Sequence, residues 1–368
     1  MNKRLTGLIH FPANIESNLF YSALATLMLY LENINEDTPF YCGKQKAYCF
    51  MCGDCGDLPN INKHHLQQYG KYITMSGVSL MWQDDYQDDG CRTPYQTGVL
   101  PTGLTDRIDC LMRVAGYGYE RLDKQDGKEK VFTRICQSID QDRPALMKLG
   151  TGRDWDVVTG YDTEGMVLYG LDAKNYGDVV SVLPDGYTPE GEFYTSGWFD
   201  RLDQVILITS TGGKELPFEE IVARMIAELE HTKTAEEKLR SGYQALHKDN
   251  VRDWADLISR YTDYLAERRW QAAECINETL LMKTDHPARR ALLEEGTLAF
   301  LRTHDLCWEI WSYLGKEECK GFRLPEDVDQ RVLAGDNANK LHQLCDEVVE
   351  KDWKVKEILE RCLQTVSF

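Results

Sequence analysis

The first half of the chain contains three stretches with the hydrophobic spacing of a helix. Hydrophobic residues recur three and four positions apart over residues 18–32, 104–115 and 131–140. Gly116 follows the second stretch and Pro144 the third, and both residue types commonly stand just beyond a helix end. The spacing therefore predicts three helices in this half.

Four strands are predicted among and after these helices. Their expected ranges are 145–149, 156–161, 166–172 and 204–209. The segment 162–165 ends in Gly165, which supplies the positive φ of a hairpin turn between the second and third strands. Residues 187–198, with nearby glycines, are expected to form a flap over the strands. Helices followed by antiparallel strands are typical of an α+β fold, which we expect over residues 1–212.

Every hydrophobic segment from residue 217 onward has the helical period. Pro217 and Pro287 each suit the first turn of a helix. Hydrophobic residues from 254 to 265 form one stripe, and a last helical region is expected over 324–362. These patterns predict a helical bundle domain over residues 217–368, after a linker at Gly212 and Gly213.

Charge and composition exclude several classes of function. The chain has 368 residues, 42% of them hydrophobic, and a net charge of −18 that repels phosphate groups. We therefore expect no binding to nucleic acid or to anionic membrane surfaces. The aromatic run 308–313 is typical of a core or an interface, so a homodimer is one interpretation.

The cysteines and the apolar runs bear on the cellular compartment. The N-terminus lacks the pattern of a secretory signal, and the longest apolar-rich run, 19–31, falls short of the roughly 20 residues that cross a bilayer. Twelve cysteines without an export signal are typical of a reducing compartment. We expect a cytoplasmic protein.

Two segments in the first half resemble a known family. Residues 15–31 resemble the first helix of papain-like domains, as in C39-type peptidases and the butirosin-biosynthesis acyltransferase-like family. Residues 152–162 and 167–172 are similar to the paired strands of these proteins, including the run "VVTGYD". The resemblance implies a papain-like fold over residues 1–212. It also implies a cysteine nucleophile at the start of the helix, a histidine before the strand and an acidic residue after the next strand.

This sequence departs from the family at two of those three positions. Leu19 stands at the nucleophile position and Asp154 at the histidine position, whereas Asp172 retains the acidic one. Thiol catalysis needs a sulfur and an imidazole within hydrogen-bond reach. The resemblance therefore implies a degenerate domain that binds a small molecule, an acyl group, an acyl carrier or a peptide. The residues expected to contact that ligand are Ser17, Asn18, Trp155 and Asp156.

A second interpretation keeps an enzyme activity. In it, Asp154 and Asp172 act as catalytic residues of an acyltransferase or amidohydrolase of the butirosin-biosynthesis type. An aspartate is a weak base unless burial raises its pKa, so this chemistry depends on the surroundings of both carboxylates.

A cluster of cysteines supports a third interpretation. The cluster consists of Cys42, Cys49, Cys52 and Cys55, with His64 and His65 as further candidate ligands. Clustered thiolates in a reducing compartment favour zinc or an iron–sulfur cluster over disulfides. The alternatives are an interaction protein in which a metal staples this loop, or a loop of reduced thiols.

The metal interpretation predicts about one equivalent of zinc, or about two to four equivalents of iron for an iron–sulfur cluster, per chain after anaerobic purification. Elemental analysis measures it, and the paired variant Cys52→Ser/Cys55→Ser should lose the metal. The variant Cys136→Ser, which changes a cysteine outside the cluster, should retain it. A wild-type protein without zinc or iron contradicts this interpretation.

Overall fold

The computed structural model describes residues 2–9, 19–40, 60–75, 104–149, 155–172, 185–214, 216–231, 244, 249–318 and 323–365. The chain forms two compact units, and Leu216 and Pro217 lie on either side of the boundary between them. Unit 1 contains the described residues within 2–72 and 104–216, and unit 2 contains residues 73–75 and the described residues within 217–365.

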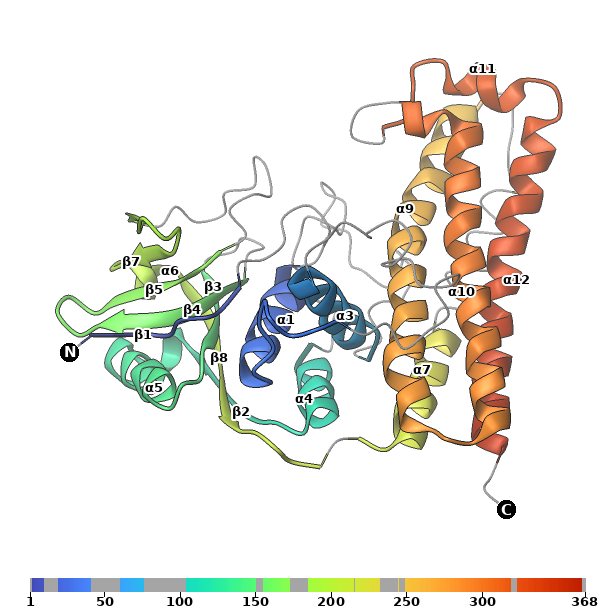
Figure 1. Cartoon of the computed structure of the whole chain (residues 1–368). Coiled ribbons are helices and arrows are strands. Elements are labelled where there is room, and N and C mark those ends of the chain that lie inside the picture. Colours follow the sequence, from blue (N-terminus) through green and yellow to red (C-terminus); the bar gives the residue numbers. More distant parts are fainter. Residues whose placement is uncertain are drawn as a thin grey trace. The chain divides into compact units, whose positions relative to one another are not determined.

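Unit 1 is built on an antiparallel sheet (Figure 1). Its strands are β1 (Asn2–Arg4), β2 (Gly118–Asp123), β3 (Ala145–Leu149), β4 (Trp155–Asp162), β5 (Val167–Leu171), β6 (Gly186–Tyr187), β7 (Phe193–Thr195) and β8 (Leu202–Ser210). They follow the order β2-β8-β3-β4-β5-β7-β6, and β1 pairs with the end of β4. A Cβ atom on Gly160 would lie 2.7 Å from the Lys3 carbonyl oxygen, so the close approach of β1 to β4 requires glycine there.

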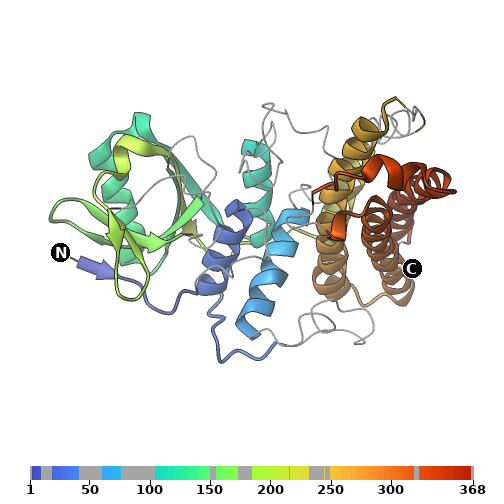
Figure 2. The same cartoon turned by 90° about the horizontal axis from the view of Figure 1, so that it is seen from above.

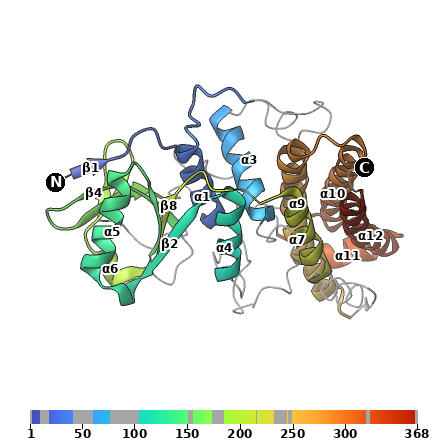
Figure 3. The ribbon, with the colours of Figure 1, turned by 90° about the horizontal axis from the view of Figure 1, so that it is seen from below.

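The helices of unit 1 lie on both faces of the sheet or against another helix. They are α1 (Leu19–Leu31), α3 (Asn60–Met75), α4 (Leu104–Ala115), α5 (Lys128–Asp140) and the short α6 (Trp198–Arg201). Ala145 and Met147 of β3 join α5 in one core cluster, and their neighbour Leu146 points to the opposite face because side chains alternate along a strand. Figure 3 shows α5 and α1 on opposite sides of β8.

Helix α1 is the central element of unit 1. Residues 20–29 are all buried, although the helix contains Ser22 and Thr26. A helix that is hydrophobic all round must be covered on every side. Helix α1 contacts β4 and β3 on one side, and Tyr21 packs against Tyr69 of α3 on another, with ring centroids 6.4 Å apart. Figure 2 shows α1 between the sheet and α3.

Unit 2 is a helical bundle. Its elements are α7 (Phe218–His231), α9 (Val251–Cys275), a π-helical turn (Ile276–Leu280), a 3₁₀ turn (Leu281–Lys283), α10 (Pro287–Leu314), a second 3₁₀ turn (Lys316–Glu318), α11 (Val328–Leu333) and α12 (Asn337–Gln364). Helix α10 packs against α9 and α12, and α12 packs against α7. No helix in the described ranges is both long and apolar enough to cross a bilayer.

Most predicted helices and strands are present within three residues of their expected ends. The segment 187–198, predicted as a flap, instead supplies part of the sheet: Tyr187 ends β6, residues 193–195 form β7, which pairs with β5, and Phe193 joins the core. The sequence pattern missed β1, β2 and α3. Of these, β2 and α3 carry many polar residues, and β1 has only three residues, so none has a clear hydrophobic period.

A buried ion pair crosses the core of unit 2. Arg269 of α9 and Asp352 of α12 have side chains that are 0% and 1% exposed. The Arg269 Nε atom donates to both carboxylate oxygens, at 3.0 and 2.9 Å, and a second guanidinium nitrogen donates to Oδ2 at 2.5 Å. Removal of one partner from such a pair leaves an uncompensated buried charge.

We expect Arg269→Met to lower the free energy of unfolding by about 3–5 kcal/mol, because it leaves the Asp352 carboxylate buried without its cation. Urea denaturation measures the loss. The double variant Arg269→Met/Asp352→Leu should recover much of it, since no buried charge remains. The matched control is Arg302→Met, which breaks an exposed pair with Glu347 and should cost no more than about 1 kcal/mol. Equal losses in the two single variants would contradict this expectation.

Candidate functional site

The structure describes part of the predicted site. Leu19 is the first residue of α1, and Trp155, Asp156 and Asp172 lie on or beside β4 and β5. The remaining predicted residues lie outside the described ranges; they are Ser17, Asn18, Asp154, Cys42, Cys49, Cys52 and Cys55.

The start of α1 meets the start of β4. The ring of Phe20 packs edge-on against that of Trp155, with centroids 4.9 Å apart and an angle of 66° between the rings. Both side chains are buried, at 0% and 1% exposed. The described side chains at this junction are therefore aromatic, where the family pattern implies a sulfur and an imidazole.

The indole group of Trp155 carries a buried donor. Its Nε1 atom has no hydrogen-bond partner among the residues that the structure describes. A buried N–H group that loses its hydrogen bond to water without a replacement destabilises the protein. An acceptor atom of a ligand at this junction would remove that cost.

The hydrogen-bond partner of Asp172 is a tyrosine, whereas the family pattern implies a histidine. The Tyr187 hydroxyl group donates to its Oδ2 atom at 2.5 Å, from β6 to the end of β5. The other oxygen, Oδ1, is buried and unpartnered within the described part of the chain. Since Val157 pairs with Leu171, the preceding Asp156 and the following Asp172 lie on one face of the sheet.

Burial and the carboxylates of Asp172 and Asp156 together set the pKa of Tyr187. Burial raises the pKa of Tyr187 above its usual value, and the hydrogen bond to Asp172 raises it further. The negative charges of Asp172 and Asp156 act in the same direction, because both disfavour the phenolate. The phenol is thus held in its neutral form, as the donor to Asp172.

The two histidines considered as metal ligands have structural contacts. The Nε2 atom of His65, on α3, lies 3.0 Å from Thr26 Oγ1 and 3.0 Å from the Ser22 carbonyl oxygen of α1. Thr26 is about 10 Å along the helix axis from Leu19. The Nε2 atom of His64 lies 3.3 Å from the Thr38 carbonyl oxygen. In the ranges that the structure describes, no three His, Cys, Asp or Glu residues are placed to hold a metal ion.

Sequence reasoning missed two polar partners near this region. One is Tyr187, which the sequence placed in a flap rather than on Asp172. The other is Glu192, which accepts from the Thr159 hydroxyl group at 2.7 Å and lies 3.6 Å from Arg4. Neither residue stands near its partner in sequence, and no motif links them.

No family model, curated protein or solved structure matches this chain.

The variant Asp172→Asn should lower the pKa of Tyr187 toward the usual value of about 10, because it removes a negative charge beside the phenol. The shift should be incomplete, since burial is the largest cause of the raised pKa. NMR titration of protein with 13Cζ-labelled tyrosine measures it, and Tyr187→Phe assigns the signal.

The matched control is Asp203→Asn, which removes an exposed carboxylate paired with Lys148. It should leave the Tyr187 titration unchanged. A Tyr187 pKa that is the same in wild type and Asp172→Asn would show that the hydrogen bond does not form in solution.

Proposed function

We propose that unit 1 is a papain-like domain that binds a small molecule, an acyl group or a peptide at the junction of α1 and β4, without thiol-peptidase activity. The buried, unpartnered indole N–H group of Trp155 beside Phe20 is the observation that carries the proposal. It supplies a hydrogen-bond donor at the place where the family has its nucleophile and its base.

Three further features support a papain-like architecture. A central helix, α1, is buried against an antiparallel sheet, and its first turn lies against the first residue of β4. The acidic residue that follows β5 is Asp172. This order of helix, strand and carboxylate is the order that the sequence resemblance implies.

The loss of thiol chemistry follows from the residue types. A leucine stands at the nucleophile position and an aspartate at the histidine position. Asp172, which would orient the imidazole, instead accepts from Tyr187. A thiolate–imidazole pair has no sulfur and no ring nitrogen at these positions, so peptide hydrolysis by that route is not available.

The chemistry of the junction points to an acceptor-bearing ligand. An indole N–H group only donates, so its partner must present an oxygen or another acceptor. Acyl and peptide carbonyl groups do so. A ligand with a carbonyl group therefore fits this donor.

The test uses N-acetyl-L-alanine methylamide as the probe, with protein in which tryptophan is 15N-labelled. The chain has eight tryptophans, so each indole N–H group gives its own signal. The Trp155 signal should move on addition of the probe. Trp155→Phe keeps the aromatic ring but removes the donor, and it should weaken binding about five-fold. Trp308→Phe, which changes an exposed tryptophan of unit 2, should bind like wild type.

A Trp155 signal that the probe leaves unmoved would contradict the binding proposal.

The acyltransferase or amidohydrolase interpretation is favoured by Asp156 and Asp172, which lie on one face of the sheet. It has a separate readout: p-nitrophenyl acetate should acylate one residue, and Asp154→Asn and Asp172→Asn should each abolish that labelling. Such labelling would replace the binding proposal with the enzyme interpretation.

A further inference from the structure

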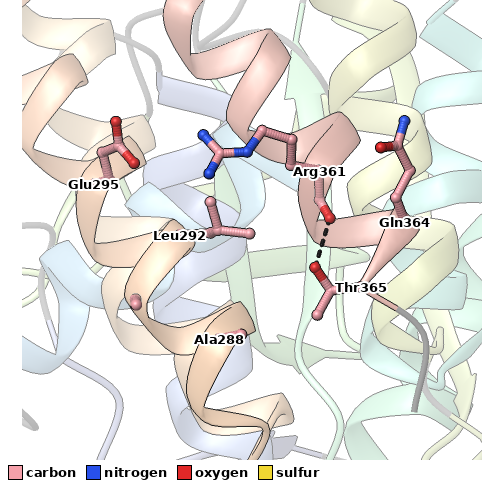
Figure 4. Close-up of a pocket in the computed structure, with 7 residues that line it drawn as sticks. Ala288, Leu292, Glu295, Arg361, Gln364 and Thr365 are labelled. Atoms are coloured by element: carbon pink, nitrogen blue, oxygen red, sulfur yellow. Dashed lines mark hydrogen bonds between the residues drawn. The ribbon is translucent and has the colours of Figure 1, made fainter. Parts of the chain in front are cut away.

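Unit 2 has a pocket of about 500 Å³ between the start of α10 and the end of α12. This volume lies within the range of about 300–1,000 Å³ that is typical of small-molecule sites. The pocket is lined by Ala288, Ala291, Leu292 and Glu295 of α10 and by Arg361, Gln364 and Thr365 at the end of α12 (Figure 4).

Small side chains on α10 open this space. Ala288 and Ala291 leave room where longer side chains would fill the groove between the helices. Leu292, which is 9% exposed, supplies apolar surface at its base. The pocket therefore offers a short apolar surface that is open to solvent.

Of the two charged residues that line the pocket, Glu295 has an ion-pair partner and Arg361 has none in the described ranges. The carboxylate of Glu295 is paired with Lys354, whose Nζ atom lies 2.9 Å from Oε1. The guanidinium group of Arg361 has no ion pair or side-chain hydrogen bond to any residue in the described ranges. Figure 4 shows the Arg361 side chain extending from α12 toward α10, with its guanidinium group on the side of Glu295.

Two arginines near the pocket act on the thiol of Cys362. Burial raises the pKa of Cys362 to about 11, and the Arg289 and Arg361 guanidinium groups oppose that rise. Arg289 is already neutralised by Glu219, at 2.9 Å. Arg361, which lines the pocket, has no such anionic partner in the described ranges.

We propose that this pocket binds the carboxylate end of a small molecule with a short apolar tail, and that Arg361 holds the carboxylate. A guanidinium group presents two parallel donors that match the two carboxylate oxygens. A single guanidinium balances one negative charge, which suits a carboxylate better than a phosphate dianion. The tail lies on Ala288, Ala291 and Leu292. This proposal does not depend on the function of unit 1.

The test is a titration of the full chain with sodium hexanoate, followed by NMR of 13C-labelled leucine methyl groups. The Leu292 signal should shift with saturation. Hexanol, with the same tail and no charge, should bind at least about ten-fold more weakly, because it loses the charge-assisted hydrogen bonds. Inorganic phosphate, with the charge and no tail, should leave the Leu292 signal in place.

Two variants test the charge of Arg361 and the volume of the pocket independently. Arg361→Gln should weaken hexanoate binding about ten-fold, and Ala291→Leu should abolish it by filling the space. The matched control, Arg260→Gln, removes an exposed arginine of α9 paired with Asp256 and should bind like wild type. The proposal is overturned if Leu292 does not respond to hexanoate, if hexanol or phosphate shifts it equally, or if Arg361→Gln binds as tightly as Arg260→Gln.

Discussion

The burial of residues 20–29 of α1 is the constraint on which unit 1 depends. A helical segment that is buried all round needs protein on every side, and the sheet and α3 supply two of those sides. The same packing brings Phe20 against Trp155, so the geometry of the candidate site is set by how α1 is covered. The candidate site is thus a consequence of the core.

Burial also decides which polar groups are used for structure. Thr26 and His65 are both buried and contact each other between α1 and α3, and Arg269 and Asp352 do so across unit 2. These groups satisfy one another, so they hold helices together. Trp155 Nε1 differs, since no described residue accepts from it. The contrast explains why a tryptophan in this core is a better candidate for ligand contact than the fully buried histidine.

The two units offer different recognition chemistry. The junction in unit 1 presents an uncharged donor among aromatic rings, which suits a carbonyl group. The pocket in unit 2 presents a guanidinium group above small apolar side chains, which suits a carboxylate. Each site is composed of residues from two elements, and neither site uses the other unit.

The sequence by itself determined the helices and strands in which hydrophobic residues recur at a clear helical or strand spacing. The hydrophobic spacing over residues 18–32 predicted the helix, whereas its burial on every side came from the structure. Gly165 marks the hairpin between β4 and β5 because only a residue tolerant of positive φ fits there. The sequence also showed where the chain departs from the papain-like pattern that it resembles, at Leu19 and Asp154, and where it agrees, at Asp172. Only the tertiary structure decided the partners. Tyr187 reaches Asp172, Thr26 reaches His65 and Arg269 reaches Asp352 from separate elements, and such contacts depend on how elements pack, which no local pattern encodes.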